Sequence, residues 1–153
     1  MKILNLTQHI PTPAQYEAGV IDFPQEESRI IKILLTFTGT PSGEEVIVRA
    51  ESLAKLANDF CEKESTNRVM IGAVGYLTGV LEIALDSYGI EPLYANTDRE
   101  SVEIPDPDNP NATIKTQVFK HLGWTPGLVV TYFFAKTVGT DLHQNQFSTK
   151  HLE

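Results

Sequence analysis

Three polar segments, each directly after an apolar segment, hold the side chains best suited to chemistry. They are Thr7-Gln8-His9, Gly72-Ala73-Val74-Gly75-Tyr76 and Asn96-Thr97-Asp98-Arg99-Glu100. Together they offer an imidazole, hydroxyl and amide groups, glycine backbone and a guanidinium. Groups of these kinds can hold a small anion and move a proton on it, so we expect a site for a small anionic ligand.

Two side chains in these segments are candidate catalytic residues. His9 can act as a general base, because imidazole exchanges a proton near neutral pH; the alternative is a capping or surface histidine. Arg99 can grip a phosphate or carboxylate with its forked guanidinium. The alternative for Arg99 is a salt bridge with the neighbouring Asp98 or Glu100.

The other expected site residues are ligand-binding. Gly72 and Gly75 stand between a strand and a helix, where a ligand can approach the backbone and free amides attract phosphate; the alternative is a tight turn without a ligand. The expected ligand-binding residues are Thr7, Gln8, Gly72, Gly75, Tyr76, Asn96 and Thr97. No Cys/His spacing typical of zinc and no Gly-x-Ser-x-Gly motif occurs, so we expect no metal and no cofactor.

Apolar runs at residues 2–6, 68–72 and 90–95 predict three strands that must position these segments. Helical patterns lie between them. Thr12 and Gln15 form the pattern of a capping box, as do Ser42 and Glu45, and helices are expected at residues 24–35, 42–64 and 77–88. Crossovers that contain helices imply parallel strands, whose carboxyl ends share one edge of the sheet. We therefore predict an α/β, Rossmann-like three-layer domain with a mainly parallel sheet and helices on both faces.

The pattern changes after Thr97. Residues 101–104 and 113–121 predict an antiparallel C-terminal β-hairpin with a turn-rich tip, and residues 128–138 fit either a strand or a helix. We expect a domain at residues 1–124, an extension at 125–140 that packs on the domain or on a partner, and a loose tail at 141–153. Leu152-Glu153 is interpreted as the remnant of an expression tag.

Composition narrows the classes of function. The net charge of −8 argues against binding of duplex nucleic acid, because a diffuse acidic surface repels phosphate. No apolar run approaches the roughly 20 residues that cross a bilayer, so no membrane partner is expected. A single cysteine, Cys61, favours the cytoplasm and a buried thiol. The apolar segment at residues 128–138 predicts a homodimer.

The runs Val69-Met70-Ile71-Gly72 and Leu93 to Arg99 resemble small CRISPR-associated Rossmann-fold (CARF-like) proteins, including stand-alone ring nucleases. The likeness is a glycine-interrupted strand, a helix, and a strand that ends in Tyr-Ala-x-Thr/Ser-x-Arg. Asn5 to His9 matches the polar turn after the first strand. The resemblance covers roughly residues 1–124, whereas Asp98, Glu100 and the extension from Thr125 depart from the pattern.

This resemblance implies a homodimer with a cyclic oligoadenylate bound across the two strand-end faces. It also implies metal-independent cleavage, in which a ribose 2′-hydroxyl attacks and a 2′,3′-cyclic phosphate forms. The residues that would line such a site are Thr7, Gln8, His9, Gly72, Thr97 and Arg99. The alternatives are a non-catalytic ligand-binding or interaction module and a small hydrolase of an unrelated substrate.

Overall fold

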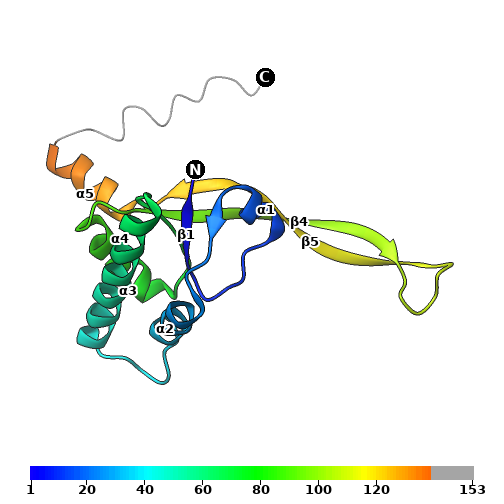
Figure 1. The fold of residues 1–153 in the computed structure, drawn as a ribbon, viewed down its shortest axis with the longest axis horizontal. Helices are drawn as coiled ribbons and strands as arrows, with labels where there is room; N and C mark the ends of the chain where they lie inside the picture. Colours follow the sequence, from blue (N-terminus) through cyan, green and yellow to red (C-terminus); the bar gives the residue numbers. More distant parts are fainter. Residues whose placement is uncertain (139–153) are drawn as a thin grey trace.

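The structure is a computed structural model, and it describes residues 1–138. The tail expected at 141–153 and the tag remnant lie outside the described residues. Figure 1 shows a body of helices and strands from which a long two-stranded ribbon projects.

One five-stranded sheet forms the centre of the body. Its strands are β1 (Ile3–Leu6), β2 (Val20–Ile21), β3 (Arg68–Ile71), β4 (Glu91–Pro105) and β5 (Thr113–Pro126), in the order β2-β1-β3-β4-β5. β2, β1, β3 and β4 are parallel, and β5 is antiparallel to β4. The predicted α/β class with a mainly parallel sheet is therefore confirmed.

The helices begin where the sequence supplies their caps. They are α1 (Pro13–Glu17), α2 (Gln25–Leu35), α3 (Gly43–Glu64), α4 (Gly75–Asp86) and α5 (Val129–Val138). Thr12 and Gln15 form the predicted capping box at α1, and the Ser42 side chain accepts a hydrogen bond from the Glu45 amide at α3. The segment at 128–138, for which strand and helix were both open, is thus a helix from Val129.

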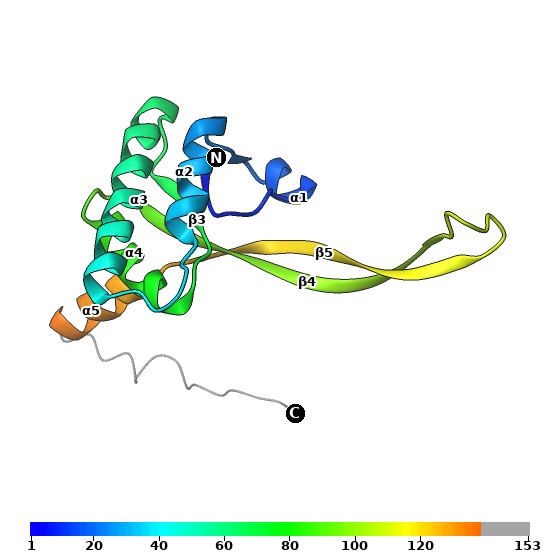
Figure 2. The same ribbon diagram turned by 90° about the horizontal axis from the view of Figure 1, so that it is seen from below.

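Most of the hydrophobic core lies on one face of the sheet. There α2, α3 and α4 gather (Figures 1 and 2), and side chains such as Leu53, Leu77 and Leu81 are fully buried against β1 and β3. The larger part of the buried apolar area, and with it most of the hydrophobic stabilisation, is on this face.

The opposite face carries a small cluster around Ile3, Met70 and Leu93, with Trp124 packed against it. The short α1 contacts both β2 and β5, the two edge strands, so the sheet curls around this cluster. Among the described residues the helix on this side has five residues. A complete third layer, as the Rossmann-like prediction required, is therefore not confirmed.

The boundaries predicted around Thr97 are wrong. The strand expected at 90–95 and the hairpin strand expected at 101–104 are one strand, β4, which continues through Asn96–Glu100 instead of turning there. β5 supplies the reason, since it pairs with β4 from Leu93↔Pro126 to Pro105↔Thr113, with an irregularity between Asn96 and Thr97. Cross-strand hydrogen bonds override the polar composition that suggested a turn.

Beyond this irregularity the two strands leave the sheet as a ribbon, the arm, comprising residues 97–121. The arm extends away from the helices in both views (Figures 1 and 2).

The sequence also failed to predict β2, which has two residues and too little length for a periodic pattern. Gly19 precedes β2 with φ of +100°, and a Cβ there would meet the Met1 carbonyl oxygen at 1.9 Å, so only glycine fits.

Candidate functional site

Three parallel strands, β2, β1 and β3, end at the same edge of the sheet, whereas β4 continues past this edge into the arm. Leu6 pairs with Ile71 at the ends of β1 and β3, so Thr7 and Gly72 follow side by side. A Cβ on Gly72 would lie 3.6 Å from Cγ2 of Thr7. The expected approach of the first two segments is therefore present, and β2 adds Asp22 at the same edge.

Asn5, a buried residue at the end of β1, holds the first segment in place. Its Nδ2 donates to the His9 carbonyl at 2.9 Å and to Oδ1 of Asp22 at 2.8 Å. Its Oδ1 accepts from the Thr7 hydroxyl at 2.7 Å and from the Thr7 amide at 3.2 Å. Both hydrogens and both lone pairs of the amide are used, which fixes its orientation and the path of the turn.

The same network continues to the molecular surface. The Thr7 hydroxyl accepts from the His9 amide at 3.1 Å, and the Tyr16 hydroxyl donates to Oδ2 of Asp22 at 2.6 Å. This bond to a carboxylate raises the pKa of Tyr16 above its ordinary value, because phenolate formation would remove the donor and add a like charge. The turn from Thr7 to His9 is thus rigid in its backbone, while the Gln8 and His9 side chains are exposed.

A groove of about 580 Å³ opens between this turn and α2, and we call it the α2 groove. Its lining mixes polar and apolar side chains and includes two cations of α2 and two carboxylates. The lining residues are Asn5, Thr7, Gln8, His9, Ile10, Asp22, Phe23, Gln25, Glu26, Ser28, Arg29 and Lys32. Arg29 pairs with Glu26 at 3.2 Å on the exposed surface, whereas Lys32 has no ion pair among residues 1–138.

The second expected segment begins α4 and lies beside the loop after α2. Gly75 is the first residue of α4, and its neighbour Tyr76 packs edge-on against Phe37 with ring centroids 5.3 Å apart. The Val74 position has no side-chain cap. Gln8 lies beside this loop, with its Oε1 3.4 Å from the Thr36 hydroxyl, which donates at 2.7 Å to the Lys32 carbonyl.

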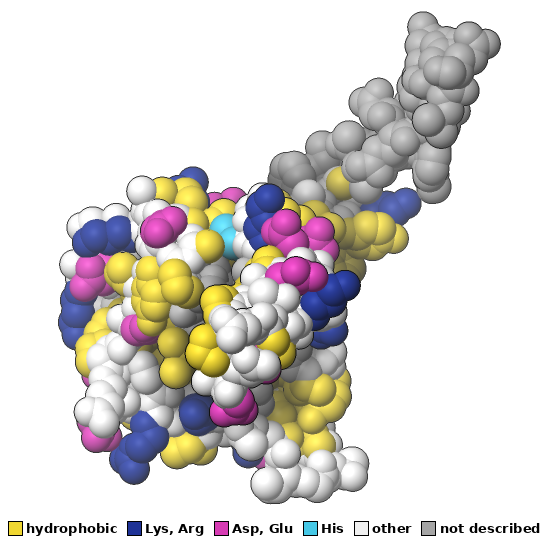
Figure 3. All heavy atoms as spheres, turned by 90° about the vertical axis from the view of Figure 1, so that its right-hand side faces the viewer, with side chains coloured by type: hydrophobic (Ala, Val, Ile, Leu, Met, Phe, Trp, Pro, Cys, Tyr) yellow, Lys and Arg dark blue, Asp and Glu magenta, His cyan; other side chains and the backbone are white. Residues whose placement is uncertain are grey.

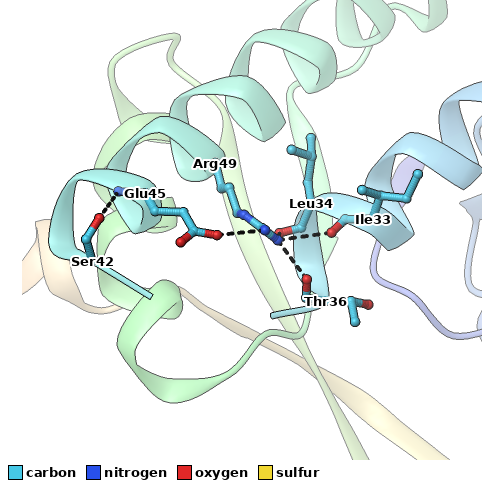
Figure 4. Close-up of polar contacts among 6 residues, drawn as sticks. All are labelled: Ile33, Leu34, Thr36, Ser42, Glu45 and Arg49. Carbon is cyan, nitrogen blue, oxygen red and sulfur yellow. Dashed lines mark hydrogen bonds and ion pairs between the residues drawn. The ribbon is translucent and has the colours of Figure 1, made fainter. Parts of the chain in front are cut away.

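Arg49 of α3 fixes the loop that carries Phe37. Its guanidinium donates to the carbonyls of Ile33, Leu34 and Thr36 at 3.1, 3.3 and 2.7 Å, and pairs with Glu45 at 2.8 Å (Figure 4). Its Cζ also lies 4.4 Å from the centre of the Phe37 ring. These carbonyls are at the negative end of α2, where a cation is favourable.

The third expected segment lies on β4, and its members diverge. Nδ2 of Asn96 donates to the Thr125 hydroxyl at 2.8 Å across the ribbon. Thr97 pairs with His121 in the arm, and Arg99 pairs with Phe119, with its Cζ 5.4 Å from the Phe119 ring centre. The guanidinium of Arg99 is thus directed across the ribbon, and the α2 groove is lined by Arg29 and Lys32 instead.

Among the groove residues that were not singled out from the sequence are Asn5, Asp22, Arg29 and Lys32. Asn5 and Asp22 depend on β2, whose short apolar run Val20-Ile21 was the one available signal. Arg29 and Lys32 were interpreted only as part of an amphipathic helix. Their i, i+3 spacing places both on one helix face, but nothing in the sequence shows that this face borders the turn after β1.

Charge on the face seen from the tip of the arm is mixed. Acidic and basic side chains alternate with apolar ones there, and neither sign dominates (Figure 3). Within residues 1–138 no group of three or more His, Cys, Asp or Glu side chains is placed to hold a metal ion. No helix in the same range combines the length and apolar character required to cross a membrane.

Fold and site together define an α/β protein whose curled, mainly parallel sheet gathers polar groups at its carboxyl edge. Comparison with protein families matches residues 1–125 to the Uncharacterized protein MJ1673 family. Because this match covers most of the chain, the protein belongs to that family. Neither the curated proteins nor the solved structures gave a match.

Proposed function

We propose that the protein binds a small anionic nucleotide in the α2 groove. The observation that supports this most directly is the composition of that groove. The rigid turn presents the exposed amide of Gln8 and imidazole of His9 on one side, and Lys32 and Arg29, the latter paired with Glu26, lie on the other. Ligands of open parallel sheets bind at this edge, and guanidinium and ammonium groups are the usual partners of phosphate.

Within this proposal the first candidate ligand is a cyclic oligoadenylate, which the resemblance to CARF-like proteins suggests. The protein then acts in the cytoplasm as a CRISPR-associated, ring nuclease-type phosphodiesterase. The 2′-oxygen of one ribose attacks the adjacent phosphorus, the bond from phosphorus to the 5′-oxygen breaks, and a 2′,3′-cyclic phosphate and a 5′-hydroxyl remain. His9 takes the proton of the 2′-hydroxyl, the leaving 5′-oxygen takes a proton from water, and Lys32 faces the charge on the phosphate.

Binding is tested by calorimetry with cyclic tetra-adenylate, ATP and inorganic phosphate. Lys32→Ala is expected to weaken nucleotide binding by about 1.5–3 kcal/mol, the usual worth of a charged hydrogen bond. Lys55→Ala is the matched control, because Lys55 is an exposed lysine on α3 that pairs with Asp59. Arg99→Ala tests the residue first expected from the sequence. Equal affinities of the wild type, Lys32→Ala and Lys55→Ala proteins would refute the α2 groove as the site.

Cleavage is tested separately by ³¹P NMR of the same mixture, where a 2′,3′-cyclic phosphate has a distinct resonance. His9→Ala should bind the nucleotide and leave it intact.

The second candidate function is a non-catalytic binding module. One observation favours it, since no hydrogen bond within residues 1–138 orients the His9 imidazole, as an activated base usually requires. Binding by the wild type without turnover would establish this alternative.

A further inference from the structure

The outer side of the helical layer carries an apolar groove that the proposed function does not use. It runs between α3 and α4, has a volume of about 580 Å³, and includes Ile47, Val48, Val80, Ile83 and Tyr88 in its lining. A second hollow of about 450 Å³ at the start of α3 shares Ile47 and Val80 with it. We call the two together the helix groove.

The helix groove is apolar where a monomer surface is normally polar. Val48 and Ile83 are 53% and 51% exposed, and they face the groove from α3 and α4 respectively. On α3 the lining residues Ile47, Val48, Glu51 and Lys55 follow helical spacing, and so do Val80, Ile83, Ser87 and Tyr88 on α4. Two helices that expose such rows form a channel suited to a third helix, the usual way in which a helical segment is recognised.

The same molecule presents a helix that fits this description. α5 buries Ala135 and leaves Tyr132 and Phe133 exposed, with Phe133 at 58%; Leu128, the residue before α5, is exposed as well. Leu128, Tyr132 and Lys136 recur at spacings of four, and Phe133 lies next to Tyr132; we call these four residues the α5 ridge. α5 packs on α4 through the contact of Val129 with Gly79, and Glu82 accepts a 2.9 Å hydrogen bond from the Val129 amide. The ridge therefore lies beside the helix groove on the same helical layer.

Charge supports a match between the ridge and the groove. Lys136 is the single charged residue of α5. Glu51 lines the helix groove, and neither it nor Lys136 has an ion-pair partner among residues 1–138. The neighbouring lysine of the groove, Lys55, is already paired with Asp59 at 3.1 Å. Glu51 therefore places a carboxylate at the edge of the helix groove, where it can pair with Lys136, the one cation of the α5 ridge.

We propose that a second copy of this chain covers the helix groove, with the α5 ridge of each protomer inserted into the groove of the other. One molecule carries both complementary surfaces, so a two-fold axis satisfies both at once and closes the assembly. Lys136 of each copy then meets Glu51 of the other. The arm lies at the opposite end of the molecule from α5 (Figures 1 and 2), so it stays outside this interface.

The test measures the mass of the full chain by light scattering and its dissociation constant by sedimentation equilibrium. We expect twice the chain mass of 17.0 kDa at 100 µM. Ile83→Glu should weaken the dimer by at least about 100-fold, because it leaves an unpaired charge in the interface. Ile33→Glu is the matched control, an isoleucine on α2 outside the helix groove that is 60% exposed, against 51% for Ile83. Circular dichroism establishes that each variant is folded.

A charge exchange identifies the partner surfaces. Glu51→Lys and Lys136→Glu should each weaken the dimer about 2- to 5-fold, the worth of an exposed ion pair, and the double variant should restore it. A measured mass of 17.0 kDa for the wild-type protein means a monomer and overturns the proposal, even if another partner covers the helix groove. The proposal is also overturned if Ile83→Glu leaves the dissociation constant of the dimer unchanged. The same holds if the double variant Glu51→Lys and Lys136→Glu weakens the dimer by as much as the two single changes added together. None of these outcomes depends on a nucleotide.

Discussion

The guanidinium of Arg49 donates a 2.7 Å hydrogen bond to the backbone carbonyl of Thr36. This bond joins the second turn of α3 to the residue that ends α2. The bond to Leu34 satisfies another carbonyl at this helix end, whereas the bond to Ile33 adds a second donor to a carbonyl that already accepts the Thr36 amide at 3.2 Å. The loop that follows thus has a fixed origin, and Phe37 is held between Arg49 and Tyr76.

Replacement of Arg49 by alanine should lower the free energy of unfolding by about 2–3 kcal/mol, since several charge-assisted hydrogen bonds are lost together. Arg49→Lys should recover less than half of this loss, because a lysine has one nitrogen, whereas Arg49 contacts the carbonyls with Nη1 and Glu45 with Nη2. Urea denaturation measures both. Arg29→Ala is the control, with a side chain 71% exposed and an expected loss below about 1 kcal/mol. Equal losses of unfolding free energy in Arg49→Ala and Arg29→Ala would contradict the stabilising role given to the hydrogen bonds of Arg49.

The Asn5 network predicts a result that depends on pH. Asn5→Asp places a carboxylate where Nδ2 now donates to Asp22 at 2.8 Å, so two like charges meet and the pKa of the introduced group rises. A raised carboxyl pKa destabilises the folded state above the unfolded pKa, and this loss is relieved as the pH falls. Thermal unfolding of this variant at pH 7 and pH 4.5 measures the effect relative to wild type.

The control for this prediction exchanges the amide of Asn5 and the carboxylate of Asp22. Asn5→Asp combined with Asp22→Asn restores one carboxylate and one amide, so it should recover part of the stability at pH 7. Recovery stays incomplete because the His9 carbonyl loses its donor. If Asn5→Asp is as stable as wild type at pH 7, Asn5 and Asp22 do not interact as described.

Cys61 predicts a loss of stability in alkali. Burial raises the pKa of its thiol to about 11, whereas an unfolded thiol titrates near 8.5. Between these values the unfolded chain releases a proton that the folded chain retains, so stability is complete below about pH 8.5 and falls by about 2–3 kcal/mol as the pH reaches 11. Urea denaturation at pH 8 and pH 10.5 detects this.

Tyrosines titrate in the same range, so the cysteine contribution has to be isolated. Burial and the bond to Glu82 raise the pKa of Tyr94, which adds a slope of the same sign at higher pH. Cys61→Ala should flatten the decline between pH 8 and pH 10, and Tyr94→Phe should leave that part unchanged. A decline in Cys61→Ala identical to that of wild type would show that the thiol does not contribute.

Glu82 predicts how α5 is attached. Its carboxylate is buried, accepts the Tyr94 hydroxyl at 2.5 Å and the Val129 amide at 2.9 Å, and lies where a Cβ on Gly127 would clash. Glu82→Ala should lower global stability by about 1–3 kcal/mol, because it leaves two partly buried donors without their acceptor. Hydrogen exchange of the Val129 amide should also accelerate. Asp86→Ala, an exposed acid on the same helix, is the control; equal exchange rates in the two variants would exclude a specific role of Glu82.

The sequence predicted the elements of the body because their signals are local. The capping box of Thr12 and Gln15, the cap at Ser42 and the apolar run at 69–71 each require only neighbouring residues. Parallel pairing followed from the long helical crossovers. These features were enough to place Thr7 beside Gly72, which share the edge where β1 and β3 end.

The rest of the site depends on contacts between distant residues. The polar run from Asn96 to Glu100 has the composition of a turn, and only pairing with β5 extends it as a strand. That pairing carries Arg99 across the ribbon to Phe119. Asp22 joins the network through a two-residue strand, and Lys32 through the packing of α2, so neither contact has a signature within its own segment.

The arm makes β4 a mechanical lever. Its first residues are bonded in parallel to β3 in the body, and the same strand continues to the tip at Pro105. The nine residues from Thr97 to Pro105 span about 30 Å, at about 3.3 Å per residue. A rotation of about 10° at the irregularity between Asn96 and Thr97 would displace the tip by about 5 Å, while Tyr94, two residues before it, stays anchored on Glu82. A load applied at the tip is thus converted into torque at the edge of the sheet that borders Gly72.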